Sequence, residues 1–173
     1  VTVPGDLMLN SVEAGPYDRR GPVDELIVEI ASFESGTVSA DVVPGHADAG
    51  SSRVVWRVAA PDVGSYAWVR DVRGRIAANR QFFGALRSLP LTGQVEASAR
   101  RTGATSALVE LRSTGYSYLA RLMAPVPRVR YDSNYLDLRD GESRVVTVTG
   151  LADLPSLTVA TYGSAPRPVT VVG

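Results

Sequence analysis

The chain has 173 residues, no cysteine, and 18 basic and 18 acidic side chains, which give a formal net charge of zero. Charges of both signs are interspersed, so no basic surface for nucleic acid or anionic lipid is expected, and no run of about 18 apolar residues could span a membrane. We therefore expect a globular chain with neither nucleic acid nor a membrane as partner. The absence of cysteine fits a bacterial cytoplasmic protein and a secreted protein alike.

The first 23 residues contain three Pro and three Gly and show no sustained hydrophobic period. This pattern predicts a linker or docking arm over residues 1–23. The apolar residues Leu7, Met8, Leu9 and Tyr17 cannot be buried within such an arm, so we expect it to lie along a sandwich or another domain. A start at Val1, without an initiator Met or a leader, is expected for a fragment or a processed polypeptide.

A first β-sandwich module is predicted over residues 24–86. Short apolar or alternating runs bounded by Gly, Pro, Ser or Asp predict strands at 25–32, 36–43, 53–60 and 65–72. Gly74 lies where a tight hairpin requires a positive φ, so residues 75–83 should return antiparallel to the preceding strand. We favour this hairpin over a helix beginning at Arg75.

A second sandwich is predicted over residues 87–163, after a connector at 84–93 that contains Pro90 and two Gly. Its strands are expected at 94–101, 106–113, 116–124, 128–138, 143–150 and 156–163. Alternation places Val95, Ala97 and Ala99 opposite Glu96, Ser98 and Arg100, and places Val146 and Val148 opposite Thr147 and Thr149. Such strands, with little helix to cover them, must pack sheet on sheet. Residues 164–173 are expected to be a tail.

The run Arg130-Tyr-Asp-Ser-Asn-Tyr-Leu-Asp-Leu-Arg-Asp-Gly-Glu142, with the following strand to Val148, resembles a known family segment. That segment is F-S-D-N-Y-F-D-L-x-P-G-E, in the C-terminal immunoglobulin-like domain of β-mannosidases and exo-β-glucosaminidases of glycoside hydrolase family two. Residues 65–83 resemble the family's strand pair Y-x-L-x-L-x-D-x-x-G-K-x-x-S-R-N-x-F-F, and LRSLPL resembles its proline-containing connector. Two departures are the permuted order Tyr131-Asp-Ser-Asn134 and Arg139-Asp140, where Pro is common.

The resemblance implies an all-β fold of tandem immunoglobulin-like antiparallel β-sandwich modules. It also implies a retaining glycosidase that hydrolyses terminal β-linked sugars, with its two Glu residues on a (β/α)₈ barrel and its acid/base in an Asn-Glu dipeptide. No Asn-Glu dipeptide occurs in this sequence, and a barrel requires about 250 residues. We therefore expect accessory scaffold domains whose partner is a catalytic barrel in cis or in another chain. A free-standing carbohydrate-binding or adhesion module is the alternative.

The segment that carries the resemblance has a structural interpretation of its own. Asp140-Gly141 is a turn dipeptide, and Asp132, Ser133 and Asn134 offer side-chain oxygens to nearby backbone N–H groups. Tyr131 and Tyr135 lie four positions apart around this irregular segment. We expect a folding corner. The alternative is a sugar or metal site made by Asp132, Asn134 and Asp137. Since calcium requires six to eight oxygen ligands, we predict no metal.

No motif for a metal, nucleotide or dinucleotide occurs, so we expect no cofactor and no catalytic residue. The only His, His46, lies in a Gly- and Ser-rich loop, so a solvated side chain is favoured over a Ser-His-Asp triad. Two pairs of aromatic residues share strand faces and are candidates for stacking on sugars: Tyr66 with Trp68, and Tyr116 with Tyr118. Packing in a core or a domain interface is the competing interpretation, and a sugar platform would require coplanar rings facing solvent.

Overall fold

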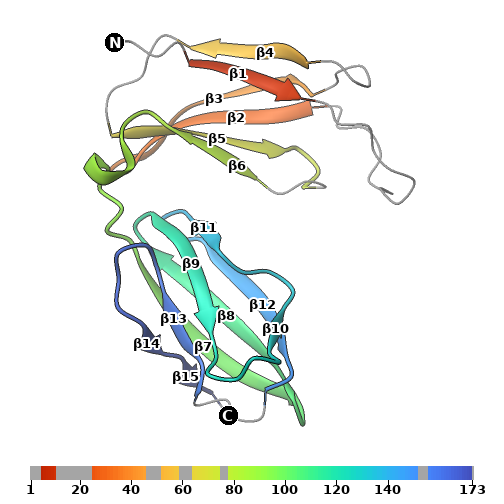
Figure 1. The fold of residues 1–173 in the computed structure, drawn as a ribbon. Coiled ribbons are helices and arrows are strands. Elements are labelled where there is room, and N and C mark those ends of the chain that lie inside the picture. Colours follow the sequence, from red (N-terminus) through yellow and green to blue (C-terminus); the bar gives the residue numbers. More distant parts are fainter. Residues whose placement is uncertain are drawn as a thin grey trace. The chain divides into compact units, whose positions relative to one another are not determined.

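The computed structural model describes residues 5–10, 25–45, 52–58, 64–74, 78–151 and 156–172. The regular structure of this part of the chain is β-strand, apart from one turn of 3₁₀ helix at Leu86–Ser88. The all-β prediction is therefore confirmed. The chain divides into two compact units, Val1–Pro90 and Leu91–Gly173, each with its own sheets (Figure 1).

The first unit contains a four-stranded antiparallel sheet in the order β3-β2-β5-β6 and a two-stranded sheet, β1-β4. The strands are β1 (Gly5–Asn10), β2 (Glu25–Ser32), β3 (Gly36–Pro44), β4 (Ser52–Val58), β5 (Ser65–Asp71) and β6 (Asn79–Phe82). The strands predicted from residue 25 to residue 72 are thus confirmed where the structure describes them.

The linker interpretation is wrong for Gly5–Asn10, which forms β1 and pairs antiparallel with β4, so this part of the segment lies along another strand of the first unit, as expected of a docking arm. Three consecutive apolar residues, Leu7, Met8 and Leu9, show no period of two, so the local pattern does not indicate a strand. The pairing joins Gly5 to Val58, more than 50 positions along the chain, and a local pattern does not report such a contact. The remainder of residues 1–23, including Tyr17, lies outside the described residues.

The hairpin predicted around Gly74 is confirmed in its direction. Gly74 has a φ of +67° and donates its N–H to the Asp71 carbonyl at 3.0 Å, and β5 pairs antiparallel with β6. In the described part of the return strand, the residues paired with β5 are Asn79–Phe82, and residues 75–77 lie outside the described residues.

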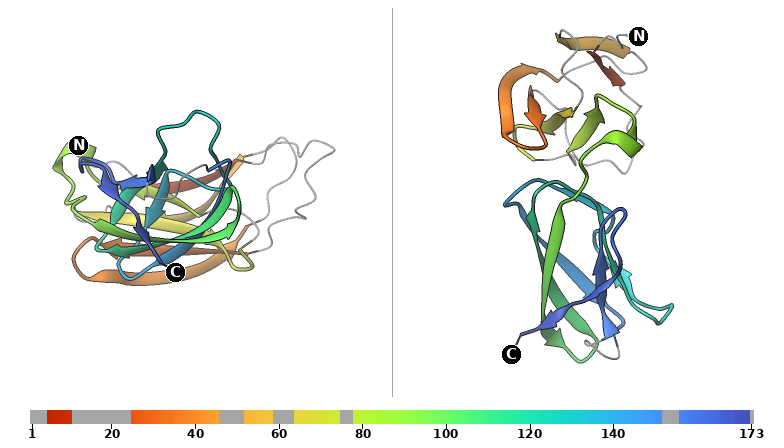
Figure 2. Two further views of the ribbon diagram at one scale, coloured as in Figure 1. Left: turned by 90° about the horizontal axis from the view of Figure 1, so that it is seen from below. Right: turned by 90° about the vertical axis from the view of Figure 1, so that its left-hand side faces the viewer.

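The second unit is a β-sandwich made of two sheets with the orders β10-β12-β8-β7-β15 and β11-β9-β13-β14 (Figure 2). Its strands are β7 (Gln94–Gly103), β8 (Ser106–Thr114), β9 (Ser117–Met123), β10 (Arg130–Tyr131), β11 (Leu136–Leu138), β12 (Ser143–Thr149), β13 (Thr158–Ala160), β14 (Arg167–Pro168) and β15 (Thr170–Val171). The strand expected at 128–138 is two short strands in different sheets, because residues 132–135 carry the chain across.

Both sheets contribute to one buried cluster in this unit. It includes Val109 and Val148 from one sheet and Leu122 and Val159 from the other, each 2% exposed or less. The predicted alternation is confirmed, since Val95, Ala97 and Ala99 are buried while Glu96 and Arg100 are exposed. Val146 and Val148 are likewise buried, and Thr149 is exposed.

The predicted tail is wrong for residues 167–172, which complete the sandwich. β14 pairs with β13 in one sheet, Val169 is 4% exposed, and β15 then pairs with β7 in the other sheet. The β15–β7 pair is parallel, which departs from the purely antiparallel arrangement we expected. Two-residue strands punctuated by Pro168 are too short for alternation to be visible in the sequence.

Candidate functional site

The corner between β10 and β11 is held by side chains that replace backbone partners. The amide of Asn134 accepts the Leu122 N–H at Oδ1 (2.9 Å) and donates from Nδ2 to the Leu122 carbonyl (3.0 Å), as a neighbouring strand would. Asp132 is joined to β12 twice: its N–H donates to the Thr147 carbonyl (3.1 Å), and its Oδ1 accepts the Thr147 N–H (3.0 Å). The corner is therefore tied to both sheets of the sandwich.

The turn after β11 is tied to the β8–β9 connection in the same manner. Asp140 accepts the Gly115 N–H at 2.7 Å, and the Gly141 N–H donates to the Ser113 carbonyl at 3.0 Å. Gly141 has a φ of +72°, in the left-handed region that favours glycine. Asp137 accepts the Leu119 N–H at 3.1 Å. The side-chain oxygens of this segment are thus engaged with backbone N–H groups on β9, on β12 and in the β8–β9 connection.

This arrangement does not gather the oxygens of Asp132, Asn134 and Asp137 around one point. Each of the three binds a different strand position: Thr147, Leu122 and Leu119. Among the residues that the structure describes, no group of three or more His, Cys, Asp or Glu side chains is placed to hold a metal ion.

The two tyrosines of the corner differ in environment. Tyr131 is half-buried, and this burial, with a smaller contribution from Tyr135, raises the pKa of its phenol above the ordinary value of 10.0. Tyr135 is 63% exposed and has a φ of +59°, a conformation that costs a residue with a Cβ about 1 to 2 kcal/mol. Its N–H donates to the Asn134 side chain at 3.1 Å. Tyr135 is therefore an exposed aromatic ring on a strained but well-anchored backbone.

Tyr66 and Trp68 lie on one face of β5, as predicted, and are only 2% and 5% exposed. Their rings meet edge to face, with an interplanar angle of 82°. Tyr66 also contacts the rings of Phe33 at 4.9 Å and Phe82 at 6.5 Å, measured between centroids. This geometry is that of a packed aromatic cluster and does not offer the coplanar, solvent-facing pair that a sugar platform requires.

Tyr116 and Tyr118 are not equivalent. Tyr116 is 3% exposed, whereas Tyr118 is half-buried beside Tyr162, at a centroid distance of 5.5 Å and an interplanar angle of 59°. Tyr162, which sequence reasoning did not single out, is 42% exposed. His46 and its neighbours lie outside the described residues, so the triad alternative is not addressed by the structure.

Among the described residues, no helix has the length and hydropathy needed to cross a membrane.

No protein-family model matches the sequence, and no curated protein matches it either.

Solved structures do show similarity. A β-D-mannosidase from Dictyoglomus thermophilum is 16% identical over 86% of this chain and 19% of its own, with a TM-score of 0.54. The exo-β-D-glucosaminidase CsxA is 15% identical over 84% of this chain and 23% of its own, with a TM-score of 0.58. The exo-chitosanase CsxA from Amycolatopsis orientalis is 13% identical with the same coverages and a TM-score of 0.53.

At these identities the similarity establishes the fold alone, and the resemblance drawn from the sequence is confirmed at that level. The chain spans about a fifth of the length of the structures it matches, namely 19% to 23%. It therefore corresponds to a partial region of these glycosidases.

Proposed function

We propose that this chain is a non-catalytic accessory part of a glycoside hydrolase of the β-mannosidase or exo-β-glucosaminidase type, which hydrolyses terminal β-linked sugars. The observation that carries the proposal is the match of most of the chain, 84% to 86%, to only 19% to 23% of such enzymes. A fold that makes up a minor part of a large enzyme supports a scaffold role. The catalytic barrel, in cis or in a separate chain, is then its partner.

The hydrogen bonding of the corner supports this assignment. A retaining glycosidase needs two carboxylates about 5 to 5.5 Å apart that are free to act as acid/base and nucleophile. The carboxylates of Asp132 and Asp137 accept backbone N–H groups from β12 and β9, and that of Asp140 accepts one from the β8–β9 connection. A carboxylate that accepts such bonds is held in place as a structural group.

The burial of the aromatic residues separates the proposal from its alternative. A free-standing carbohydrate-binding or adhesion module would present coplanar aromatic rings to solvent, whereas Tyr66, Trp68 and Tyr116 are at most 5% exposed. The more exposed pair, Tyr118 and Tyr162, is tilted by 59°. These observations favour the scaffold role over the binding module.

The mode of docking follows from the charge pattern. The net charge is zero and the charges of both signs are mixed along the chain. Since no charged cluster is available to steer association, we expect an apolar interface with little dependence on ionic strength.

Calorimetry of this chain with the catalytic barrel of the same enzyme, produced separately, tests the partner. We expect binding whose affinity changes less than about tenfold between low and high salt, with an unrelated glycosidase barrel as the control. A fall of about a hundredfold would contradict apolar docking. No binding to the barrel would count for the free-standing module.

A further inference from the structure

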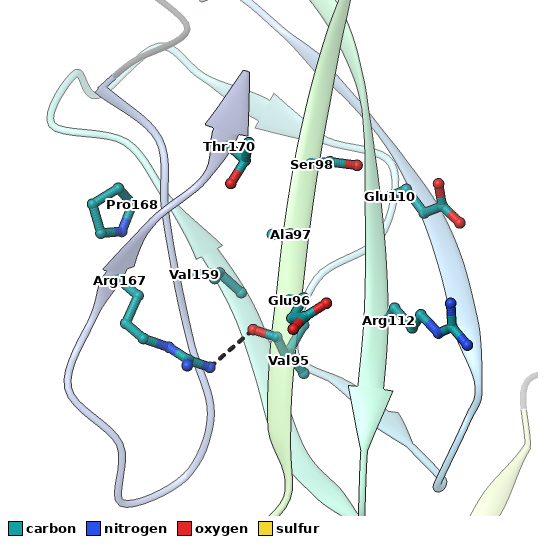
Figure 3. Close-up of a pocket in the computed structure, with 10 residues that line it drawn as sticks. All are labelled: Val95, Glu96, Ala97, Ser98, Glu110, Arg112, Val159, Arg167, Pro168 and Thr170. Carbon is teal, nitrogen blue, oxygen red and sulfur yellow. Dashed lines mark hydrogen bonds between the residues drawn. The ribbon is translucent and has the colours of Figure 1, made fainter. Parts of the chain in front are cut away.

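A groove lies on the second sandwich where β7 faces β14 and β15 (Figure 3). Its volume is about 480 Å³, within the range of small-molecule sites, which is roughly 300 to 1,000 Å³. Its polar lining comes from Glu96 and Ser98 on β7, Glu110 and Arg112 on β8, and Arg167 and Thr170 on the C-terminal strands. All of these residues belong to one compact unit.

The groove exists because the chain changes sheets at Pro168. β15 pairs with β7 in parallel from Thr170 onward, and the Val172 N–H donates to the Ala99 carbonyl at 2.9 Å. Continuing this register toward the N-terminus would place residue 168 beside the Val95 carbonyl, but proline has no N–H to donate. The guanidinium of Arg167 donates to that carbonyl instead, at 3.0 Å. The backbone hydrogen-bond ladder between β15 and β7 is thus interrupted at Pro168, where the groove begins.

The hydrogen bond that Arg167 donates to the Val95 carbonyl, in place of the N–H that Pro168 lacks, also fixes the position of its guanidinium. A second nitrogen of its guanidinium donates to the Gln94 side chain at 3.1 Å, so the group is held at two points. Arginine has five N–H donors, and those not used in these two bonds remain for a ligand. On the opposite side, Glu96 lies directly across the β7–β8 ladder from Arg112, and Ser98 lies across from Glu110. The polar groups are therefore carried by strands, which place side chains more accurately than loops.

The lining of the groove is chemically complementary to a polyhydroxylated ring. Ala97 and Val159 line the groove from the core, at 8% and 2% exposure, and the exposed ring of Pro168 adds C–H surface. The lining also contains two carboxylates and two guanidiniums, so its formal charge is zero. Neighbouring acceptors and donors match vicinal hydroxyl groups, which both donate and accept, while the exposed ring of Pro168 offers C–H surface to the C–H face of a pyranose.

We propose that this groove binds one or two uncharged pyranose units of a saccharide. The choice of a β-linked mannosyl saccharide rests on the proposed function; the site itself rests on the groove. Glu110 and Arg112 contact the hydroxyl groups, Arg167 provides a fixed donor at the other wall, and no bond is made or broken.

Amide chemical-shift mapping of the full chain with β-1,4-mannotriose, raised to about 10 mM, tests the site. We expect amide shifts confined to residues 96–98, 110–112, 167 and 169–170, since Pro168 has no amide N–H. Glu110→Gln combined with Arg112→Gln should weaken binding by about tenfold or more, because charged hydrogen-bond partners of the hydroxyls are lost. Arg100→Gln, on the same face of β7 but outside the groove, is the matched control and should leave affinity unchanged.

Shifts elsewhere, no shifts at the highest concentration, or equal affinity in the double variant would overturn the proposal. A parallel titration with the β-1,4-linked glucosamine trimer distinguishes ligand classes, since binding of this cationic saccharide alone would contradict an uncharged ligand. Mass spectrometry of the recovered saccharide separates the two proposals. Cleaved saccharide would count against the non-catalytic function, whereas missing shifts with intact saccharide count only against the groove.

Discussion

The two units of the chain bury their side chains in different ways. In the second unit, β7, β8 and β12 alternate between buried and exposed residues, and one buried cluster joins both sheets. In the first unit, β2 and β5 are buried on both faces: Leu26 and Val28 pack with Val43 on one face, while Tyr66 and Trp68 belong to an aromatic cluster on the other. Strands of similar length are therefore buried on one face in the second unit and on both faces in the first.

An alternation of apolar and polar residues therefore identifies the buried side chains of a strand only when one face of its sheet is exposed to solvent. Alternation in the second unit predicts which side chains are buried, and the structure confirms it. In β2 the run Val28, Glu29, Ile30, Ala31 is buried without alternation, and it includes a carboxylate that is paired with Arg70 at 3.4 Å. Both tryptophans, Trp56 and Trp68, lie in the first unit, so their fluorescence follows that unit alone.

The largest expected effect is a charge placed in the core of the second unit. Val148 is 0% exposed, so Val148→Asp would bury an unpaired carboxylate and should lower the free energy of unfolding by about 4 kcal/mol or more. Circular dichroism should show an earlier transition for the second unit. The tryptophan fluorescence transition of the first unit should stay where it is.

Thr147→Asp is the matched control on the opposite face of β12, where the side chain is half-buried, and it should cost about 1 kcal/mol or less. Equal losses for the two variants would show that the register of the strand is wrong. A fluorescence transition that moves with Val148→Asp would show that the two units unfold together.

A smaller effect is expected at the corner, where side chains replace strand pairing. Asn134→Ala removes two hydrogen bonds to Leu122 and leaves those backbone groups unsatisfied, which should cost about 2 kcal/mol. Ser133→Ala, at the exposed neighbouring position, should change the free energy of unfolding by less than about 0.5 kcal/mol. Denaturant titration of both variants measures the difference, and an unchanged midpoint for Asn134→Ala would contradict the bonding described above.

At Tyr135 we expect a substitution that stabilises the folded chain. Asn adopts the left-handed conformation more readily than other residues with a Cβ, so Tyr135→Asn should raise the free energy of unfolding by about 1 kcal/mol. Tyr135→Ala removes the same ring but keeps the backbone strain, and should give no such gain. If both variants were destabilised equally, the exposed ring would be contributing more than the backbone costs.

The smallest effect is a pH dependence from Tyr131. Burial raises the pKa of its phenol above 10.0 in the folded chain, so the unfolded chain ionises first as the pH rises. The contribution of Tyr131 to stability is thus fully present below pH 10.0 and is lost as the pH rises through the folded pKa. Tyr131→Phe should therefore show a shallower loss of stability above that pH. If the free energies of unfolding of the two proteins changed with pH in the same way, burial would not be raising the pKa of the Tyr131 phenol.

Much of the fold can be predicted from the sequence because the signals are local. The strands β2, β5, β7, β8 and β12 follow from short runs bounded by turn residues, and the hairpin follows from Gly74. The residues of the corner predict a turn-forming segment rich in oxygen acceptors. Its bonds to Leu119, Leu122 and Thr147 could not be predicted, because they depend on which strands the fold brings alongside.

The features that were missed depend on long-range pairing. β1 and β15 are defined by their partners β4 and β7, and neither has a period of its own. The groove depends on Arg167 and Pro168, which lie in a segment whose sequence predicts a tail. Only the register of β15 on β7 shows that Pro168 interrupts a ladder and that Arg167 replaces the missing donor.

The measurement that tests the central claim most directly is a hydrolysis assay of the purified chain with aryl β-mannoside and aryl β-glucosaminide. We expect no release of the aryl group above the buffer background, because the corner carboxylates are engaged with backbone N–H groups and the sequence contains no Asn-Glu dipeptide. Turnover that survives repurification and disappears when a single carboxylate of this chain is replaced by its amide would contradict it.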